Sequence, residues 1–391
     1  MLAAGAAMAA GAAPASATPT QFTAGDLVIY ETQGTSSAAA AVDLVDYSTA
    51  GVPSGFSVAL PTADSGATHA LVESGSALND GELTDSADGQ SLVATGYDAA
   101  VGTASITSAT GTPRTVAIVS PTGTVDTSTS LTDTTTESNN FRSATVPVTG
   151  STGSTLYTSD GAGVGVAADG GSSATYLNSD NAHEVLVVGG ELYESTASAI
   201  NQVGTGLPTS GTQTGTALVS STNALNGSKF DPDQFALVTL GTGTVPNTLY
   251  VADGAGGSKS GGNNFVEKYS LESGAWVLTG DVSVPQVVGL AVSVSAGIAS
   301  IYVTCATSNT AGNNTILDGI TDSSGFEGSL TGATVDLLAT APSGTDFKGL
   351  ALAPVASVGN QLPEAPLVIA LPLLGIGAFA VYALRVRRRT V

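Results

Sequence analysis

The sequence predicts an all-β fold, and three observations support that prediction. Gly, Ser, Thr and Ala dominate the 391 residues, and aromatic residues make up only 5%. Such a composition, with many turn formers and few helix formers, favours short strands. Short apolar segments also recur along the chain, each about as long as one strand. Finally, the repeating unit is divided between the two ends of the chain, as in a ring closed by its termini. We therefore expect a six-bladed β-propeller.

The repeat is clearest in six segments that resemble one another. Each predicts a strand of about four to six residues that is preceded by a turn. Their spacing is uneven, roughly 35 to 65 residues, which brackets the length of a four-stranded propeller blade with variable loops. The segments are residues 26–30, 91–95, 155–158, 191–194, 248–251 and 300–303.

Further apolar strands are expected on both sides of these segments. Two follow in sequence, as in 265–271 then 276–282, or 42–47 then 56–60. One precedes each of the last five segments, so that four consecutive strands form an antiparallel meander. The long stretch between Leu92 and Phe141 could hold a further blade, so seven blades remain an alternative. The preceding strands are residues 81–86, 141–148, 183–188, 235–240 and 287–294.

The first unit lacks its opening strand and begins directly at Gly25–Tyr30. A spare strand lies at the other end of the chain, at Phe347–Leu352, and resembles the opening strand Phe141–Ala144. One strand from the C-terminal end and three from the N-terminal end would complete a composite blade. Such closure leaves only short, protected sheet edges.

The run Leu249–Gly254, followed by Val266–Ser270, resembles the repeats of secreted bacterial β-propeller proteins with a C-terminal anchor. The likeness covers roughly residues 25–355. It implies the fold and a place outside the cell, and it brings no catalytic motif, because propellers serve enzymes, binding proteins and scaffolds alike.

Residues 1–17 predict a signal peptide that ends in the small-x-small pattern Ala15-Ser16-Ala17. The usual basic region is missing, so the segment is either a truncated signal peptide or a low-complexity alanine arm. The mature chain would begin near Thr18, and the propeller domain would cover residues 18–357.

The C-terminal residues predict a membrane anchor. Leu367–Leu384 contains no charged side chain and is just long enough for a transmembrane helix. The basic tail 385–391, with arginines at 385, 387, 388 and 389, would stay cytoplasmic and leave the propeller outside. The linker 358–366 holds Leu362–Pro366, which is similar to bacterial sorting signals, although Ala365 and Pro366 replace the Thr and Gly of the sortase motif.

The charge of the chain excludes one class of partner. Its 32 acidic residues outnumber the 10 basic ones, so we expect no binding to nucleic acid. The same acidity could attract divalent cations or serve solubility alone. Cys305 is the only cysteine and lies in an apolar strand pattern, which predicts a buried, inert thiol.

Candidate ligand-binding residues are expected at one mouth of the central channel. Arg142 and Lys348 each follow a Phe at matching positions of two opening strands, and His183 begins another. The two cations could bind an anionic group, with His183 beside them. They could equally pair with neighbouring acids and neutralise a crowded channel.

Candidate metal ligands are Asp98, Asp160 and Asp253, which occupy equivalent positions in three repeats. Ca²⁺ prefers several oxygen ligands from converging loops, and repeated Asp residues could supply them. The alternative is that each Asp stabilises its own turn. His69 and His183, the only histidines, lie in no zinc-binding spacing, so no zinc site is expected.

Two functions follow from these observations. The first is a membrane-anchored binding, adhesion or envelope-organising module without catalytic residues or a cofactor, whose ligand is a surface protein or a glycan. The alternative is a Ca²⁺-dependent extracytoplasmic hydrolase of the lactonase or phosphoesterase type, with its site at the channel mouth.

Overall fold

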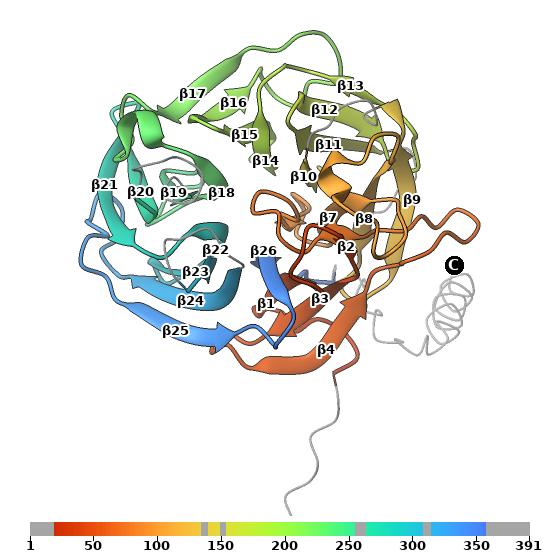
Figure 1. Cartoon of the computed structure of the whole chain (residues 1–391). Helices are drawn as coiled ribbons and strands as arrows, with labels where there is room; N and C mark the ends of the chain where they lie inside the picture. Colours follow the sequence, from red (N-terminus) through yellow and green to blue (C-terminus); the bar gives the residue numbers. More distant parts are fainter. Residues whose placement is uncertain (1–18, 134–139, 149–153, 255–262, 308–313, 357–391) are drawn as a thin grey trace, which may run out of the picture. The chain divides into compact units, whose positions relative to one another are not determined.

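The computed structural model describes residues 19–133, 140–148, 154–254, 263–307 and 314–356. These residues form six four-stranded antiparallel sheets arranged as blades around a common axis (Figure 1). The predicted all-β propeller with six blades is therefore confirmed. Within each blade the first strand lies nearest the axis, and the fourth lies at the rim (Figure 1).

From the axis outward, the blades have the following strands. Blade 1 contains β26 (Asp346–Leu352), β1 (Leu27–Thr32), β3 (Val42–Tyr47) and β4 (Pro53–Ala59); blade 2 contains β6 (Thr84–Asp85), β7 (Leu92–Tyr97), β8 (Arg114–Val119) and β9 (Val125–Leu131); blade 3 contains β10 (Phe141–Thr145), β11 (Thr155–Asp160), β12 (Gly163–Ala168) and β13 (Ala174–Tyr176). Blade 4 contains β14 (Ala182–Val188), β15 (Glu191–Thr196), β16 (Ala199–Val203) and β17 (Gly215–Ser220); blade 5 contains β18 (Pro232–Val238), β19 (Thr248–Asp253), β20 (Phe265–Glu272) and β21 (Ala275–Ser283); blade 6 contains β22 (Val287–Ser295), β23 (Ile298–Ala306), β24 (Asn314–Asp322) and β25 (Val335–Thr340).

Blade 1 is the composite blade that the sequence predicts. Strand β26 pairs antiparallel with β1, in a register that runs from Leu27 opposite Leu352 to Thr32 opposite Asp346. The register shifts between Ile29 and Glu31. This pairing joins the two ends of the propeller in one sheet and closes the ring.

The alternative of a seventh blade is wrong. The stretch between Leu92 and Phe141 supplies β7, β8 and β9, which complete blade 2. Blade 2 also has the shortest inner strand, because Gly81 and Glu82 bond to other blades instead of to β7. The Gly349 N–H donates to the Gly81 carbonyl, and the Glu82 N–H donates to the Arg142 carbonyl. The sequence did not predict the separate two-stranded sheet of β2 (Ala39–Ala40) and β5 (Glu73–Ser74).

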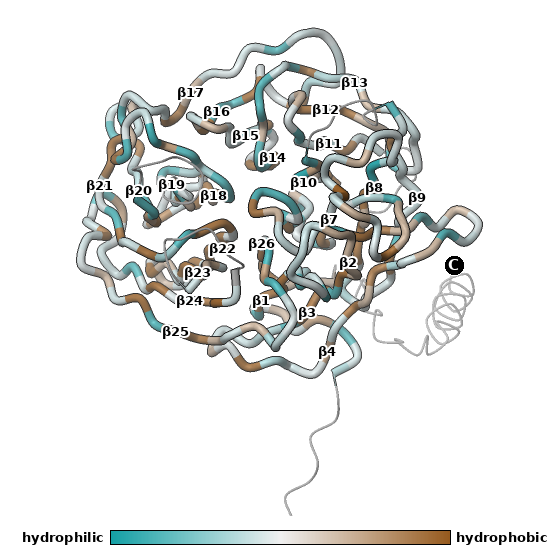
Figure 2. The backbone as a smooth tube through the Cα atoms, in the orientation of Figure 1, coloured by the Kyte–Doolittle hydropathy of each residue, from teal (hydrophilic) through white to brown (hydrophobic). Residues whose placement is uncertain are grey.

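The hydrophobic core lies between neighbouring blades. Figure 2 shows hydrophobic stretches in the strands of each blade, with hydrophilic stretches at many of the turns between them. All six residues of β1 are buried, because blades cover both faces of this strand. One cluster joins Val28 and Leu44 of blade 1 to Leu92 and Ala117 of blade 2. Full burial of a Val or Leu side chain stabilises the fold by roughly 1.5–3 kcal/mol.

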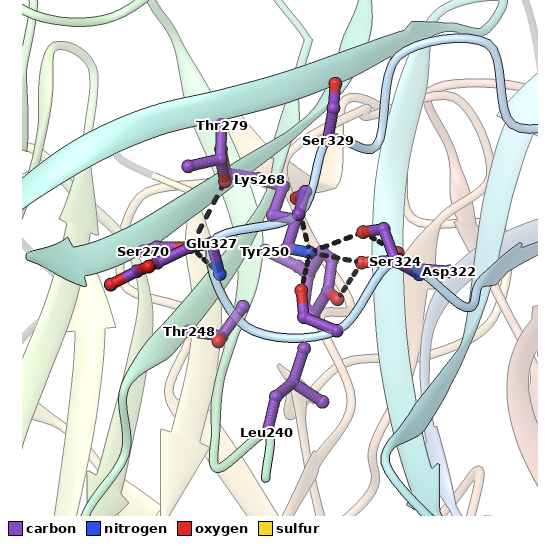
Figure 3. Close-up of polar contacts among 12 residues, drawn as sticks. Leu240, Thr248, Tyr250, Lys268, Ser270, Thr279, Asp322, Ser324, Glu327 and Ser329 are labelled. Atoms are coloured by element: carbon purple, nitrogen blue, oxygen red, sulfur yellow. Dashed lines mark hydrogen bonds and ion pairs between the residues drawn. The ribbon is translucent and has the colours of Figure 1, made fainter.

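A buried ion pair fastens blade 5 to blade 6 (Figure 3). Lys268 of β20 places its Nζ atom 2.7 Å from Oδ2 of Asp322, at the end of β24. The ammonium also donates to the Ser324 hydroxyl and to the carbonyls of Gly325 and Gly328, at 2.7–3.0 Å. Tyr250 donates its hydroxyl to the same Asp322 oxygen at 2.6 Å. One of the few basic residues is thus used entirely within the fold.

Within residues 19–356, as far as they are described, no helix is both long enough and apolar enough to cross a bilayer. The predicted transmembrane helix 367–384, the linker 358–366, the tail 385–391 and the signal peptide 1–17 all lie outside the described residues.

Closure by β26 makes a testable prediction about cooperativity. A chain ending at residue 344 should show no cooperative unfolding transition, because β1 and the inner channel wall lose their partner strand. A chain ending at residue 356, which keeps β26, should unfold in one transition. Circular dichroism during heating measures both. Equal midpoints for the two chains would show that the ring does not depend on this strand.

Candidate functional site

The centre of the ring is occupied by the chain itself. The segment 75–82, which we call the plug, leaves β5 and lies among the inner strands near the axis (Figure 1). Lys348 of β26 donates from Nζ to the Ala77 carbonyl at 2.5 Å. Asn79 donates from Nδ2 to Oδ1 of Asp233, on β18, at 2.5 Å. The plug therefore fills the end of the channel at which the inner strands begin.

Close packing at the plug requires glycine on β26. A Cβ atom on Gly349 would lie 2.3 Å from the Leu83 nitrogen and 2.6 Å from the Glu82 Cα. Because those atoms belong to the backbone, no side-chain rotation could relieve the contact. Gly349 thus allows the last residue of the plug and the residue after it to lie directly against β26.

The three predicted ligand-binding residues all lie at this end of the channel, and all are buried. Lys348 pairs with Asp346, with 2.9 Å between Nζ and Oδ2. Arg142 donates from Nη1 to the Asn181 side chain and the Ala182 carbonyl, at 2.6–2.7 Å.

His183 lies with Nδ1 3.1 Å from Oδ1 of Asp233 and 2.9 Å from the Pro232 carbonyl oxygen. Lys348 thus pairs with a neighbouring acid, whereas the Arg142 side chain bonds to an amide oxygen and a backbone carbonyl. Binding of an external anion by Arg142, Lys348 and His183 stays a prediction.

The channel also buries acids that have few charges to balance them. Burial raises the pKa of Glu82 well above its usual value, and the charges of Glu184 and Asp233 raise it further. Neither carboxylate oxygen of Glu82 has a hydrogen-bond partner among the described residues. Burial likewise raises the pKa of Glu73, which faces the charge of Asp80. These groups favour the protonated state, since a buried, unpaired carboxylate is costly.

One side chain crosses the channel and bonds to four other blades. Gln234 of β18 donates from Nε2 to the Leu83 carbonyl at 2.9 Å and to Glu184 Oε1 at 2.8 Å. Its Oε1 accepts the N–H groups of Leu290 and Leu350, at 3.2 and 3.0 Å. These partners belong to blades 2, 4, 6 and 1. A single amide thus links inner strands that share no sheet.

Beyond Gln234, the other end of the channel holds a cavity of about 240 Å³. Most of its wall is aliphatic and comes from the ends of the inner strands, and Asp85 and Glu184 supply its only carboxyl groups. Burial raises the pKa of Asp85 to about 7 and that of Glu184 to about 8. The described residues that line the cavity include no histidine, cysteine, lysine or arginine.

The predicted metal ligands do occupy equivalent places, just after or at the end of the second strand in blades 2, 3 and 5. The structure does not bring them together. Asp160 accepts the Ala162 and Gly163 N–H groups on Oδ1, at 2.7 and 3.1 Å, and the Tyr176 hydroxyl on Oδ2, at 2.6 Å. This is the turn chemistry of the alternative interpretation.

Asp253 accepts the Asp231 N–H at 3.0 Å and the Asn226 side-chain amide. Asp98 instead lies beside His69, with 3.1 Å between Oδ2 and Nδ1. Sequence analysis missed this neighbour, because His69 and Asp98 are far apart along the chain and fit no ligand spacing. Cys305 is buried as predicted, and its thiol lies 3.4 Å from Asp318.

Comparisons with known proteins give structural similarity alone. No family model matches the chain, and no curated protein matches it. A candidate 6-phosphogluconolactonase from Bacteroides uniformis has a TM-score of 0.42 at 11% identity, over 82% of this chain and 83% of that one. A chain of the nidogen/laminin complex has a TM-score of 0.41 at 11% identity, over 85% and 99%. The β-propeller domain of Myceliophteria thermophila Cps50 has a TM-score of 0.38 at 9% identity, over 75% and 85%. Similarity this low says nothing about function.

The role of Gln234 can be tested by removing its amide. Gln234→Leu should lower the free energy of unfolding by about 3 kcal/mol or more, because each buried backbone group left without a partner costs about 1–3 kcal/mol. The control is Gln202→Leu on β16, where the amide bonds to Glu191 on the partly buried outer part of the blade. Urea unfolding measures both variants. A loss no larger than that of the control would contradict the linking role.

The buried acids predict that stability falls as the pH rises. The folded chain holds the Glu184 proton up to a pKa of about 8, whereas the usual value is 4.5, so folding takes up a proton between these limits. We expect the melting temperature to fall by on the order of 5 °C between the two limits. Asp322 has a lowered pKa, and its contribution is lost only in more acidic solution.

Differential scanning calorimetry at several pH values measures this fall. Glu82→Gln should flatten the slope, because it removes one buried ionisable group and a charge near Glu184. A melting temperature that rises over the same pH range would contradict the conclusion that the acids in the channel are protonated in the folded chain.

Proposed function

We propose that the chain is a binding, adhesion or envelope-organising module without catalytic activity. Its propeller would be held outside the membrane by the C-terminal segment, with a surface protein or a glycan as ligand. The occupied channel mouth is the observation that supports this proposal. The plug fills the place where a propeller enzyme would need space for a substrate, and its Ala77 carbonyl accepts a hydrogen bond from Lys348, one of the cations predicted to bind one.

The alternative hydrolase would need a cation and acids that converge beside a substrate-sized space. Asp160 and Asp253 instead bond within their own blades. The cavity at the opposite end offers carboxyl groups in an aliphatic wall, which suits binding better than Ca²⁺-dependent hydrolysis. In this proposal the closed ring, with its channel filled, presents its outer loops to the ligand.

The proposal predicts how cells that produce the chain behave. Intact cells with the full chain should bind an antibody against the propeller, whereas a chain ending at residue 356 should be released into the medium. Beads coated with the purified full chain should attach to cell surfaces, and free glycan or surface protein should compete. Flow cytometry and bead counting measure these effects.

The same purified chain should hydrolyse neither lactones nor phosphoesters above the blank rate, with or without Ca²⁺. Ca²⁺-dependent turnover that Asp160→Asn abolishes would establish the hydrolase instead. Failure of antibody to reach the propeller on intact cells would overturn the proposed location.

A further inference from the structure

An imidazole and two carboxylates converge where the chain passes from blade 1 to blade 2. His69 Nδ1 lies 3.1 Å from Asp98 Oδ2 and 4.0 Å from Asp64 Oδ2. Each of the three side chains offers one ligand atom, and these atoms all lie within 4.8 Å of one another. Among the described residues this is the one such group with three potential ligands.

The shortest of these separations is close to the edge of a metal coordination shell. Ligands at 2.0–2.2 Å from a tetrahedral metal lie about 3.3–3.6 Å from one another. The His69–Asp98 edge is already close to that length, and the longer edge involves Asp64, whose side chain is 62% exposed. A small rotation of one exposed side chain would therefore complete the set.

The backbone already holds two of the ligands in place. Ser65 and Thr68 exchange both backbone hydrogen bonds around a tight turn, in which Gly66 has a φ of 64°. This turn brings Asp64 and His69 to the same end of the loop. Oδ1 of Asp64 accepts the Ala70 N–H at 2.9 Å, which leaves Oδ2 to face the imidazole.

The remaining contacts tie the site to blade 2. His69 bonds through its backbone to Thr127 of β9, donating its N–H at 3.1 Å and accepting the hydroxyl at 2.9 Å. Asp98 accepts the Ser130 hydroxyl at 3.3 Å, a contact of the outer-shell type that orients a ligand carboxylate.

The ligand atoms indicate the class of metal. Ca²⁺ and Mg²⁺ prefer sites made of oxygen alone, whereas one imidazole nitrogen with two carboxylate oxygens suits Zn²⁺ or a neighbouring transition metal. Three protein ligands would leave one position for water, on the side where Asp64 is exposed.

We infer that Asp64, His69 and Asp98 form a binding site for a divalent transition metal, with Zn²⁺ the best match. The metal would fasten the connecting segment 60–72 to blade 2, because two ligands lie on that segment and the third follows β7. The site is independent of the proposed binding function and of the channel.

Equilibrium dialysis of the full-length chain, purified without a histidine tag, tests the site with Zn²⁺, Mn²⁺ and Ca²⁺. Metal analysis should find one Zn²⁺ per chain, and Zn²⁺ should raise the melting temperature. His69→Ala should weaken Zn²⁺ binding by at least about tenfold. Asp64→Asn should weaken it too, and this variant keeps the Oδ1 atom that accepts the Ala70 N–H, so its fold should be unchanged.

The matched control is Asp126→Asn, which makes the same charge change at an exposed position of β9 in blade 2. It should bind Zn²⁺ as the unchanged chain does. The site is overturned if the unchanged chain binds no Zn²⁺, or if His69→Ala and Asp64→Asn bind it as tightly as Asp126→Asn. Stoichiometric binding of Ca²⁺ in preference to Zn²⁺ would overturn the choice of metal.

Discussion

The pairing of β26 with β1 is the constraint on which the structure depends. It brings residues 27–32 and 346–352 into one sheet. The ring can therefore close only when the chain between these two strands, which forms blades 2 to 6, is present. Closure covers both sheet faces of β1 and places the start of β26 beside the plug. Without it, blades 1 and 6 would expose their packing faces, and the channel would have no continuous wall.

A closed ring of inner strands creates an electrostatic problem, because the chain is rich in acids and its inner strands converge. The fold accommodates these charges in two ways. Lys348, Arg142 and Lys268 each lie buried against acceptors of the protein. The remaining carboxyl groups, such as Glu82, are held in surroundings that favour a proton. These three basic residues therefore stabilise the fold, and the buried acids make the free energy of unfolding depend on pH.

This use of charge bears on function. The plug and the amide of Gln234 join the inner strands across the axis. The proposed binding function would therefore rely on the outer loops and on the aliphatic cavity at the opposite end. The cluster of Asp64, His69 and Asp98 lies outside the channel, where the chain passes from blade 1 to blade 2. A metal bound there would stabilise the connection between these blades.

The sequence by itself determined the strands, their grouping in fours and the split blade, because alternating apolar residues and turn formers act over a few residues. It also placed Asp98, Asp160 and Asp253 at equivalent positions, and Arg142, Lys348 and His183 at one mouth of the channel. Only the tertiary structure decided what those side chains contact. The plug, the bonds of Gln234 to four other blades and the meeting of His69 with Asp98 all depend on residues distant in sequence, so no local pattern reveals them.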